Sequence, residues 1–104
     1  MKNVKKVGDD FDCSFNELKT LEGAPETVSG GFYCYKNYLT SLSGAPKEVG
    51  GNFNCSWNNL TSLEGAPKKV GGNFYCQKNQ GPNGKGFTKD DVRAVCDVKG
   101  KIFI

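Results

Sequence analysis

The chain has 104 residues, 37% of them hydrophobic, and a net charge of +3 from 14 basic and 11 acidic residues, without a histidine. This weak, dispersed charge argues against nucleic acid as a partner, and the lack of histidine removes the commonest general base and metal ligand. No stretch approaches the roughly 20 apolar residues of a membrane span, and residues 1–7 lack the apolar segment of a signal peptide, so we expect a cytoplasmic protein.

Four Phe-x-Cys motifs recur along the chain at a fixed interval. Their cysteines are Cys13, Cys34, Cys55 and Cys76, and each step is 21 residues, as in 34 − 13 = 21. A constant period of this length is typical of a solenoid, in which each repeat forms one turn and buries its apolar side against its neighbours. Residues 3–7 match residues 66–70, so we expect the chain to begin midway through a turn, with an open first edge available for pairing.

Each repeat follows the pattern V-x-G-x-F-x-C-x-x-N-x-L-T-S-L-x-G-A-P. The valine opens the turn, and the Gly-Gly steps at 30–31, 50–51 and 71–72 are expected to relax the chain before the strand. The Phe and Cys side chains then share one face of a short strand. The asparagine three residues after each cysteine is expected to satisfy the backbone of the bend, and the two leucines to point inward. Proline in Gly-Ala-Pro excludes a helix from the return leg.

The repeated cysteines allow two interpretations. Neighbouring turns lie about 4.8 Å apart, which is within the Cα range of a disulfide. However, cysteines in register on parallel strands point the same way, so buried free thiols are favoured. A cytosolic compartment, where thiols stay reduced, agrees with this interpretation.

The segment F-x-C-x-x-N-x-L resembles the core of leucine-rich repeats, with Phe and Cys in the first two leucine places. The short period and the L-T-S-L-x-G-A-P return are similar to repeats of bacteria and tailed bacteriophages, over residues 7–80. The resemblance implies a right-handed arc, a parallel sheet on its concave face, and binding as the usual task. The Phe and Cys strands and the absence of a convex helix depart from the common pattern.

The C-terminal part departs from the repeat. We expect a four-turn solenoid over residues 1–80 and a cap over residues 81–104. The cap comprises a linker that replaces the leucines, a short helix within residues 87–96 and a closing strand over residues 101–104. Thr88 is suited to cap the helix, whereas Val92, Val95 and Cys96 share its inner face. Ile102 and Ile104 have the spacing of a Phe-x-Cys pair, so we expect both to be buried beside the fourth turn.

The variable positions around Phe and Cys predict a binding surface. They carry many aromatic residues, and exposed aromatic patches usually mark interaction sites. The candidate residues on the concave face are Phe15, Tyr33, Tyr35, Lys36, Tyr38, Asn54, Trp57, Tyr75 and Lys78. Trp57, flanked by two lysines, is suited to hold an acidic or aromatic group. The alternative is that these aromatics only stabilise a thin sheet.

The sequence gives no support to catalysis, because a nucleophilic cysteine needs a base and an exposed setting. Zinc sites need four converging ligands, which a line of thiols does not provide, and the glycine-rich stretch 81–86 lacks the phosphate-loop pattern. We therefore expect neither a metal nor a cofactor. The function we expect is binding of another protein. The resemblance to the repeats of bacteria and tailed bacteriophages implies an accessory protein that inhibits a host or defence component. A binder of a nucleotide-like anion and a self-assembling scaffold remain as alternatives.

Overall fold

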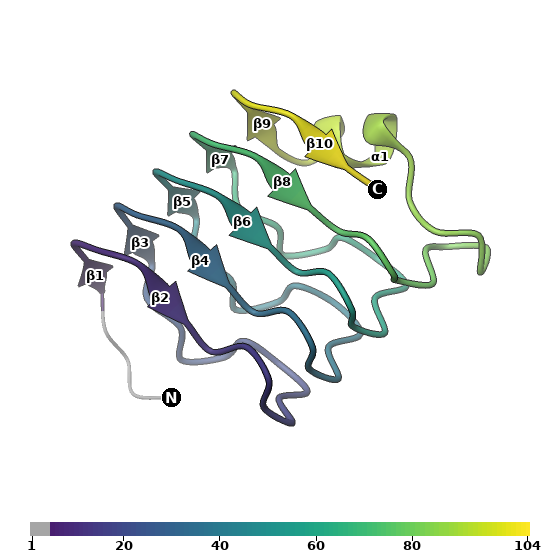
Figure 1. The fold of residues 1–104 in the computed structure, drawn as a ribbon, viewed down its shortest axis with the longest axis horizontal. Helices are drawn as coiled ribbons and strands as arrows, with labels where there is room; N and C mark the ends of the chain where they lie inside the picture. The colour runs from purple at the N-terminus through teal and green to yellow at the C-terminus, as the bar shows by residue number, and fades with distance from the viewer. Residues whose placement is uncertain (1–4) are drawn as a thin grey trace.

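The computed structural model describes residues 5–104 and consists of stacked turns, each with two short strands (Figure 1). The Val sheet contains β1 (Lys6–Val7), β3 (Thr27–Val28), β5 (Glu48–Val49), β7 (Lys69–Val70) and β9 (Asp97–Val98). The Phe sheet contains β2 (Phe11–Asp12), β4 (Phe32–Tyr33), β6 (Phe53–Asn54), β8 (Phe74–Tyr75) and β10 (Ile102–Phe103). Neighbouring strands are parallel throughout. The predicted mainly-β repeat solenoid is therefore confirmed.

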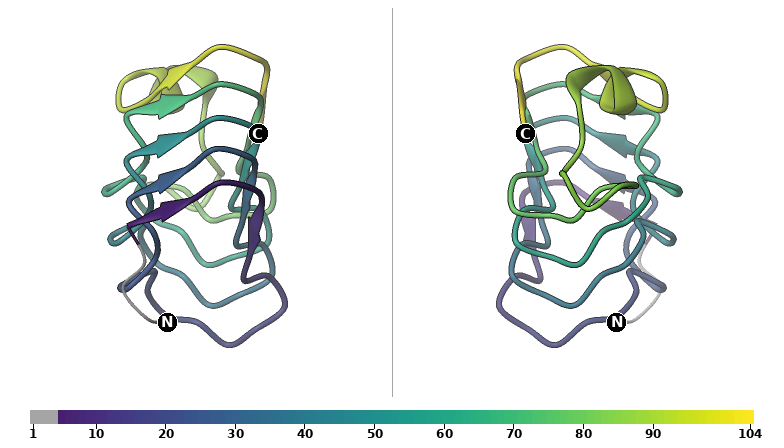
Figure 2. Two further views of the ribbon diagram at one scale, coloured as in Figure 1. Left: turned by 90° about the vertical axis from the view of Figure 1, so that its left-hand side faces the viewer. Right: turned by 90° about the vertical axis from the view of Figure 1, so that its right-hand side faces the viewer.

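The register of both sheets follows the sequence repeat. Phe11 pairs with Phe32, which pairs with Phe53, so from β1 to β8 each strand residue lies over its counterpart one period away. The Val sheet was not predicted: the valines were expected only to open each turn, but Val28 pairs with Val49 as part of a second five-stranded sheet. Figure 2 shows the two sheets on two sides of the stack, with the return legs completing each turn.

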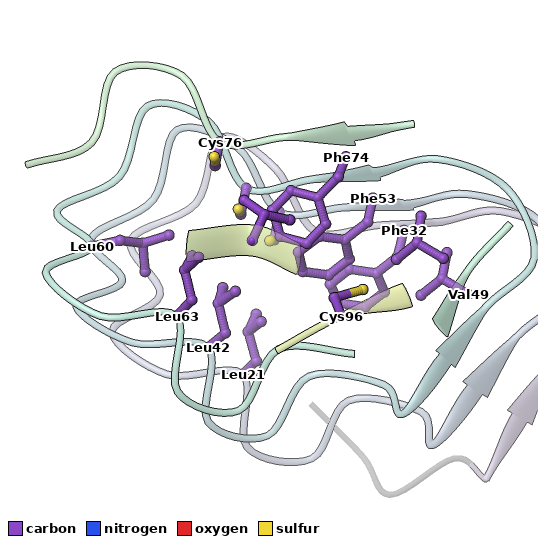
Figure 3. Close-up of a cluster of buried hydrophobic side chains, with 14 of the residues drawn as sticks. Leu21, Phe32, Leu42, Val49, Phe53, Leu60, Leu63, Phe74, Cys76 and Cys96 are labelled. Carbon is purple, nitrogen blue, oxygen red and sulfur yellow. The ribbon is translucent and has the colours of Figure 1, made fainter. Parts of the chain in front are cut away.

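The core lies inside the turns and consists of columns of identical side chains (Figure 3). The rings of Phe11, Phe32, Phe53 and Phe74 follow one another with centroids 5.4, 5.7 and 5.2 Å apart. The second leucine of each return forms another buried column, and the first leucine is buried in all copies except the half-buried Leu18. Because aromatic rings at these distances attract one another, this column stabilises the stack as well as filling it.

The asparagines that follow β4, β6 and β8 bridge neighbouring turns, as predicted. Asn37 donates through Nδ2 to the carbonyls of Cys13 and Cys34, at 3.0 and 3.1 Å. Its Oδ1 accepts from the amide of Leu18 at 3.0 Å. Asn58 makes the same pattern one turn later, donating to Cys34 and Cys55. These buried side chains thus satisfy backbone groups that the bend leaves without partners.

The paired glycines serve close packing rather than the conformational freedom that we expected. None of them lies among the residues with positive φ in the part of the chain that the structure describes. Instead, a Cβ on Gly51 would lie 2.9 Å from the carbonyl carbon of Gly30, and one on Gly50 would lie 2.2 Å from the Ser29 oxygen. Glycine is needed there because successive backbones touch.

The cap contains the predicted helix, α1 (Lys89–Arg93). Thr88 accepts from the Asp91 amide at 3.1 Å, and the Asp91 carboxylate accepts from the Thr88 amide at 2.9 Å, which is a complete capping box. Val92 and Cys96 are buried, but the prediction for Val95 was wrong, since its side chain is 39% exposed. Val95 follows the last turn of the short helix and lies at the surface of the cap.

The closing strand is confirmed, because β10 pairs with β8 and Ile102 lies opposite Phe74. This step is 102 − 74 = 28 residues, so the cap inserts seven residues into the 21-residue period. The cap also supplies β9, which extends the Val sheet and was not predicted. Ile102 is buried, whereas Ile104 is 51% exposed, contrary to expectation. Among residues 5–104, no further turn covers it.

At the other end, β1 pairs with β3 in the common register, as the match between residues 3–7 and 66–70 predicted. Residues 3 and 4 of that match lie outside the described residues. Within residues 5–104, no strand pairs with the outer edges of β1 and β2. Within the same residues, no helix has the length and apolar character needed to cross a bilayer.

Candidate binding surface

Four residues that follow the Phe-sheet strands form what we call the lysine–aromatic column: Phe15, Lys36, Trp57 and Lys78. Their φ angles are 58, 57, 56 and 59°, and no other non-glycine residue in the described range has positive φ. In the first three turns the amide of this residue donates to the next turn, for example from Trp57 to the Gln77 carbonyl at 2.9 Å. A side chain in this left-handed region costs about 1–2 kcal/mol relative to glycine. The chain nevertheless places a large side chain there in every turn.

The column alternates between aromatic rings and ammonium groups. Lys36 Nζ lies 5.1 Å from the ring centroid of Phe15 and 5.5 Å from that of Trp57, and Lys78 Nζ lies 5.7 Å from Trp57 on the other side. These separations are within the range of cation–π attraction. The rings of Phe15 and Trp57 remain 65% and 54% exposed, so their contacts with the lysines leave much of the aromatic surface available.

The other predicted aromatics fall into two groups. Tyr35 joins the column, because its ring meets that of Phe15 edge-on at 5.1 Å. Tyr33 and Tyr75 do not meet each other, since the register places Asn54 between them. Tyr75 instead stacks on Phe103, with centroids 4.7 Å apart and planes 7° from parallel. The structure therefore brings Phe15, Tyr35, Lys36, Trp57 and Lys78 together and leaves Tyr33 and Tyr75 outside that group.

A shallow depression of about 330 Å³ lies beside the column. Lys36, Trp57 and Lys78 line one part of it, and Tyr38 and Asn59 line another. Tyr38 is 52% exposed. Asn59 was not among the predicted site residues, although it occupies the same repeat position as Tyr38 and that equivalence could have revealed it. The positive φ angles were also missed, because the column contains no glycine or asparagine to signal them.

The five cysteines are all free and buried. Burial raises the pKa of the Cys13 and Cys96 thiols to about 11 and that of Cys76 to about 12. Burial also raises the pKa of Cys34 and Cys55. The Cys55 thiol donates to the Tyr75 carbonyl at 3.3 Å. Such thiols are poor nucleophiles, and no cluster of three or more His, Cys, Asp or Glu residues suited to a metal ion occurs within residues 5–104.

Comparison with known proteins gives no relative for this chain. No family model matches it, and neither a characterised protein nor a solved structure matches it.

Proposed function

We propose that the protein is a non-catalytic binding module that holds another protein against the lysine–aromatic column. The observation that carries this proposal is the retention of large side chains at four strained backbone positions. Strain of this kind clusters at functional sites, and a scaffold alone would be served better by glycine. Aromatic residues flanked by cations suit a partner that presents acidic or aromatic groups.

The competing explanation is that the column only stabilises the stack. Three exposed cation–π contacts are worth about 0.5–1 kcal/mol each, or about 1.5–3 kcal/mol together, which is less than the strain of about 4–8 kcal/mol at the four positions. Folding stability alone therefore does not favour these residues over glycine. The exposure of Trp57 and Phe15 further supports a surface used for binding.

Affinity capture with Trp57→Ala and with Lys36→Ala tests the proposal. Truncation of a central anchor is expected to cost about 2 kcal/mol or more in binding, roughly a 30-fold loss. Lys47→Ala is a suitable control, because Lys47 is an exposed lysine outside the column. Proteins captured by the wild type and the control, but lost with both column variants, would support the proposal. Undiminished capture by folded column variants would contradict it.

The depression beside Trp57 favours a second candidate, a small anionic ligand such as a nucleotide. Its volume of about 330 Å³ is at the lower end of small-molecule sites, and two lysines and an indole line it. Trp57 is the only tryptophan, so its fluorescence reports on binding directly. Saturable quenching by a nucleotide, lost in Lys36→Ala and Lys78→Ala, would favour this candidate over a protein partner.

The biological setting that we propose is that of an accessory protein that neutralises a host or defence component. It rests on the resemblance of the repeats to those of bacteria and tailed bacteriophages, which is an analogy. Five free cysteines support a reducing compartment such as the cytoplasm, the host cytoplasm if a phage encodes the protein.

A further inference from the structure

The return legs, which we define as residues 21–25, 42–46 and 63–67, stack closely on one another. The Leu21 amide donates to the Ser43 carbonyl at 3.3 Å, and the Leu42 amide donates to the Glu64 carbonyl at 2.9 Å. Gly44 and Gly65 have φ of 92 and 89°, and a Cβ on Gly65 would lie 2.5 Å from the Leu42 carbonyl carbon. Each leg is thus covered by the glycine-containing backbone of the next leg.

The third leg has no fourth leg above it. Gly86 occupies the repeat position of Gly65 and has a φ of 87°, but the nearest atom to its Cβ position is the Asn79 oxygen at 3.9 Å. Figure 1 shows the chain after β8 running away from the stack before it returns through α1. The amides of Leu21 and Leu42 each donate to the next leg. The amide of Leu63, at the same repeat position, makes no hydrogen bond within residues 5–104.

A groove of about 570 Å³ takes the place of the missing leg. Its walls include Leu63, Glu64, Pro82, Phe87, Asp91 and Val95. Leu63 and Phe87 are buried, whereas Val95 is 39% exposed. The groove therefore combines an apolar floor with two carboxylates and the Leu63 amide, which lacks an acceptor. Leaving this amide unpaired costs free energy once a ligand excludes water from it.

We propose that this groove binds an extended segment of a partner protein in which an aliphatic residue is followed by a basic residue and a glycine. The contacts between successive return legs determine which residue types fit the groove. The aliphatic side chain contacts Leu63, Phe87 and Val95. The carbonyl of the basic residue accepts from the Leu63 amide, as the Glu64 carbonyl accepts from Leu42. The glycine lies on the peptide bond after Leu63, where a Cβ would clash.

Charge selects the basic residue. Glu64 and Asp91 both line the groove, and Asp91 is fixed by the capping box with Thr88. A lysine or arginine that lies over Glu64 faces two carboxylates, whereas an acidic residue is repelled. This surface is separate from the lysine–aromatic column, so the segment bound here belongs to a second contact.

The synthetic peptide acetyl-Thr-Ser-Leu-Lys-Gly-Ala-amide tests the proposal in an NMR titration of the full chain. We expect saturable shifts at the Leu63 amide and the Val95 methyl groups. Glu64→Gln should weaken binding about twofold to fivefold, the range of one exposed charge pair. Glu22→Gln is the matched control, because Glu22 holds the same repeat position on the first leg, which the second leg already covers.

The control peptide acetyl-Thr-Ser-Leu-Glu-Gly-Ala-amide should bind more weakly than the lysine peptide. Three results would overturn the proposal: no shift of the Leu63 amide up to millimolar peptide, equal affinity for the two peptides, or equal weakening by Glu64→Gln and Glu22→Gln. Because the Glu64 side chain is exposed, Glu64→Gln is expected to leave the fold intact, so that a loss of binding reports on the groove.

Discussion

The φ of 56° at Trp57 predicts that glycine is better tolerated there than alanine. Trp57→Ala removes two exposed cation–π contacts, worth about 1–2 kcal/mol together, and keeps the left-handed backbone. Trp57→Gly removes the same contacts but also relieves about 1–2 kcal/mol of strain. The greater freedom of unfolded glycine offsets about 0.5–1 kcal/mol of that gain. Trp57→Gly should therefore be more stable than Trp57→Ala by about 0.5–1 kcal/mol.

Urea unfolding of both variants measures this difference through the midpoint, provided that the slope is unchanged. Asn59 offers a matched control, since it is exposed and does not have a positive φ. There the usual order should hold, with Asn59→Gly less stable than Asn59→Ala by about 0.5–1 kcal/mol. If Trp57→Ala equals or exceeds Trp57→Gly in stability, the left-handed backbone costs no more than the about 0.5–1 kcal/mol by which the unfolded state disfavours glycine, and strain no longer supports a binding role for the column.

Two further predictions concern the core. Ile102→Ala should lower the free energy of unfolding by about 2–5 kcal/mol, because Ile102 is 4% exposed and a cavity would remain. Ile104→Ala should change it by about 0.5 kcal/mol or less, since Ile104 is 51% exposed; equal effects in urea unfolding would contradict the assignment of the closing strand. The buried cysteines have a pKa raised from 9.0 to about 11 in Cys13 and about 12 in Cys76. Their contribution to stability should be complete below pH 9 and be lost as the pH rises through 11 and 12, and native thiol labelling at pH 8 should be slow until the protein unfolds.

The sequence predicts the parts of this fold that depend on side-chain identity at a fixed period. The Phe and Cys columns and the asparagine bridges follow from the 21-residue interval, and the place of Ile102 follows from the Phe-x-Cys spacing that Ile102 and Ile104 share. The Val sheet could not be predicted in the same way, because its strands have two residues each. A pattern of alternation cannot be recognised over so short a length, and the pairing depends on where the preceding corner places the backbone.

The candidate surface could be predicted only in part. Variable positions around the constant core indicated the candidate residues, and the structure groups five of them, three aromatic residues and two lysines. The stacking of Tyr75 on Phe103 depends on the closing strand, which restores the register after an insertion of seven residues (102 − 74 = 28). The groove beside Leu63 is equally a consequence of that insertion, because the fourth leg leaves the stack. No local pattern in residues 81–88 shows where the displaced chain goes.

The glycine column also bears on self-assembly. Gly30, Gly51, Gly72 and Gly100 occupy one position of successive turns, and a Cβ at any of them would approach the preceding turn within 3.0 Å. The first turn has Asp9 at this position. A second copy stacked in register on β1 and β2 would therefore meet the Asp9 side chain, and the backbone shift it forces costs about 1–3 kcal/mol.

Charge acts in the opposite direction, but more weakly. If a second copy continues the register, its Asp97 lies opposite Lys6 and its Lys101 lies opposite Asp10. Exposed charge pairs of this kind contribute about 0.2–1 kcal/mol each. The cost of the clash exceeds the contribution of one such pair and, over most of its range, the about 0.4–2 kcal/mol of two pairs. We therefore expect the wild-type protein to remain monomeric in light scattering as its concentration rises. Asp9→Gly removes the clash and keeps both pairs, and should show a molar mass that increases with concentration. A wild-type mass that grows with concentration, or a mass of Asp9→Gly that stays constant, would mean that Asp9 does not control this edge.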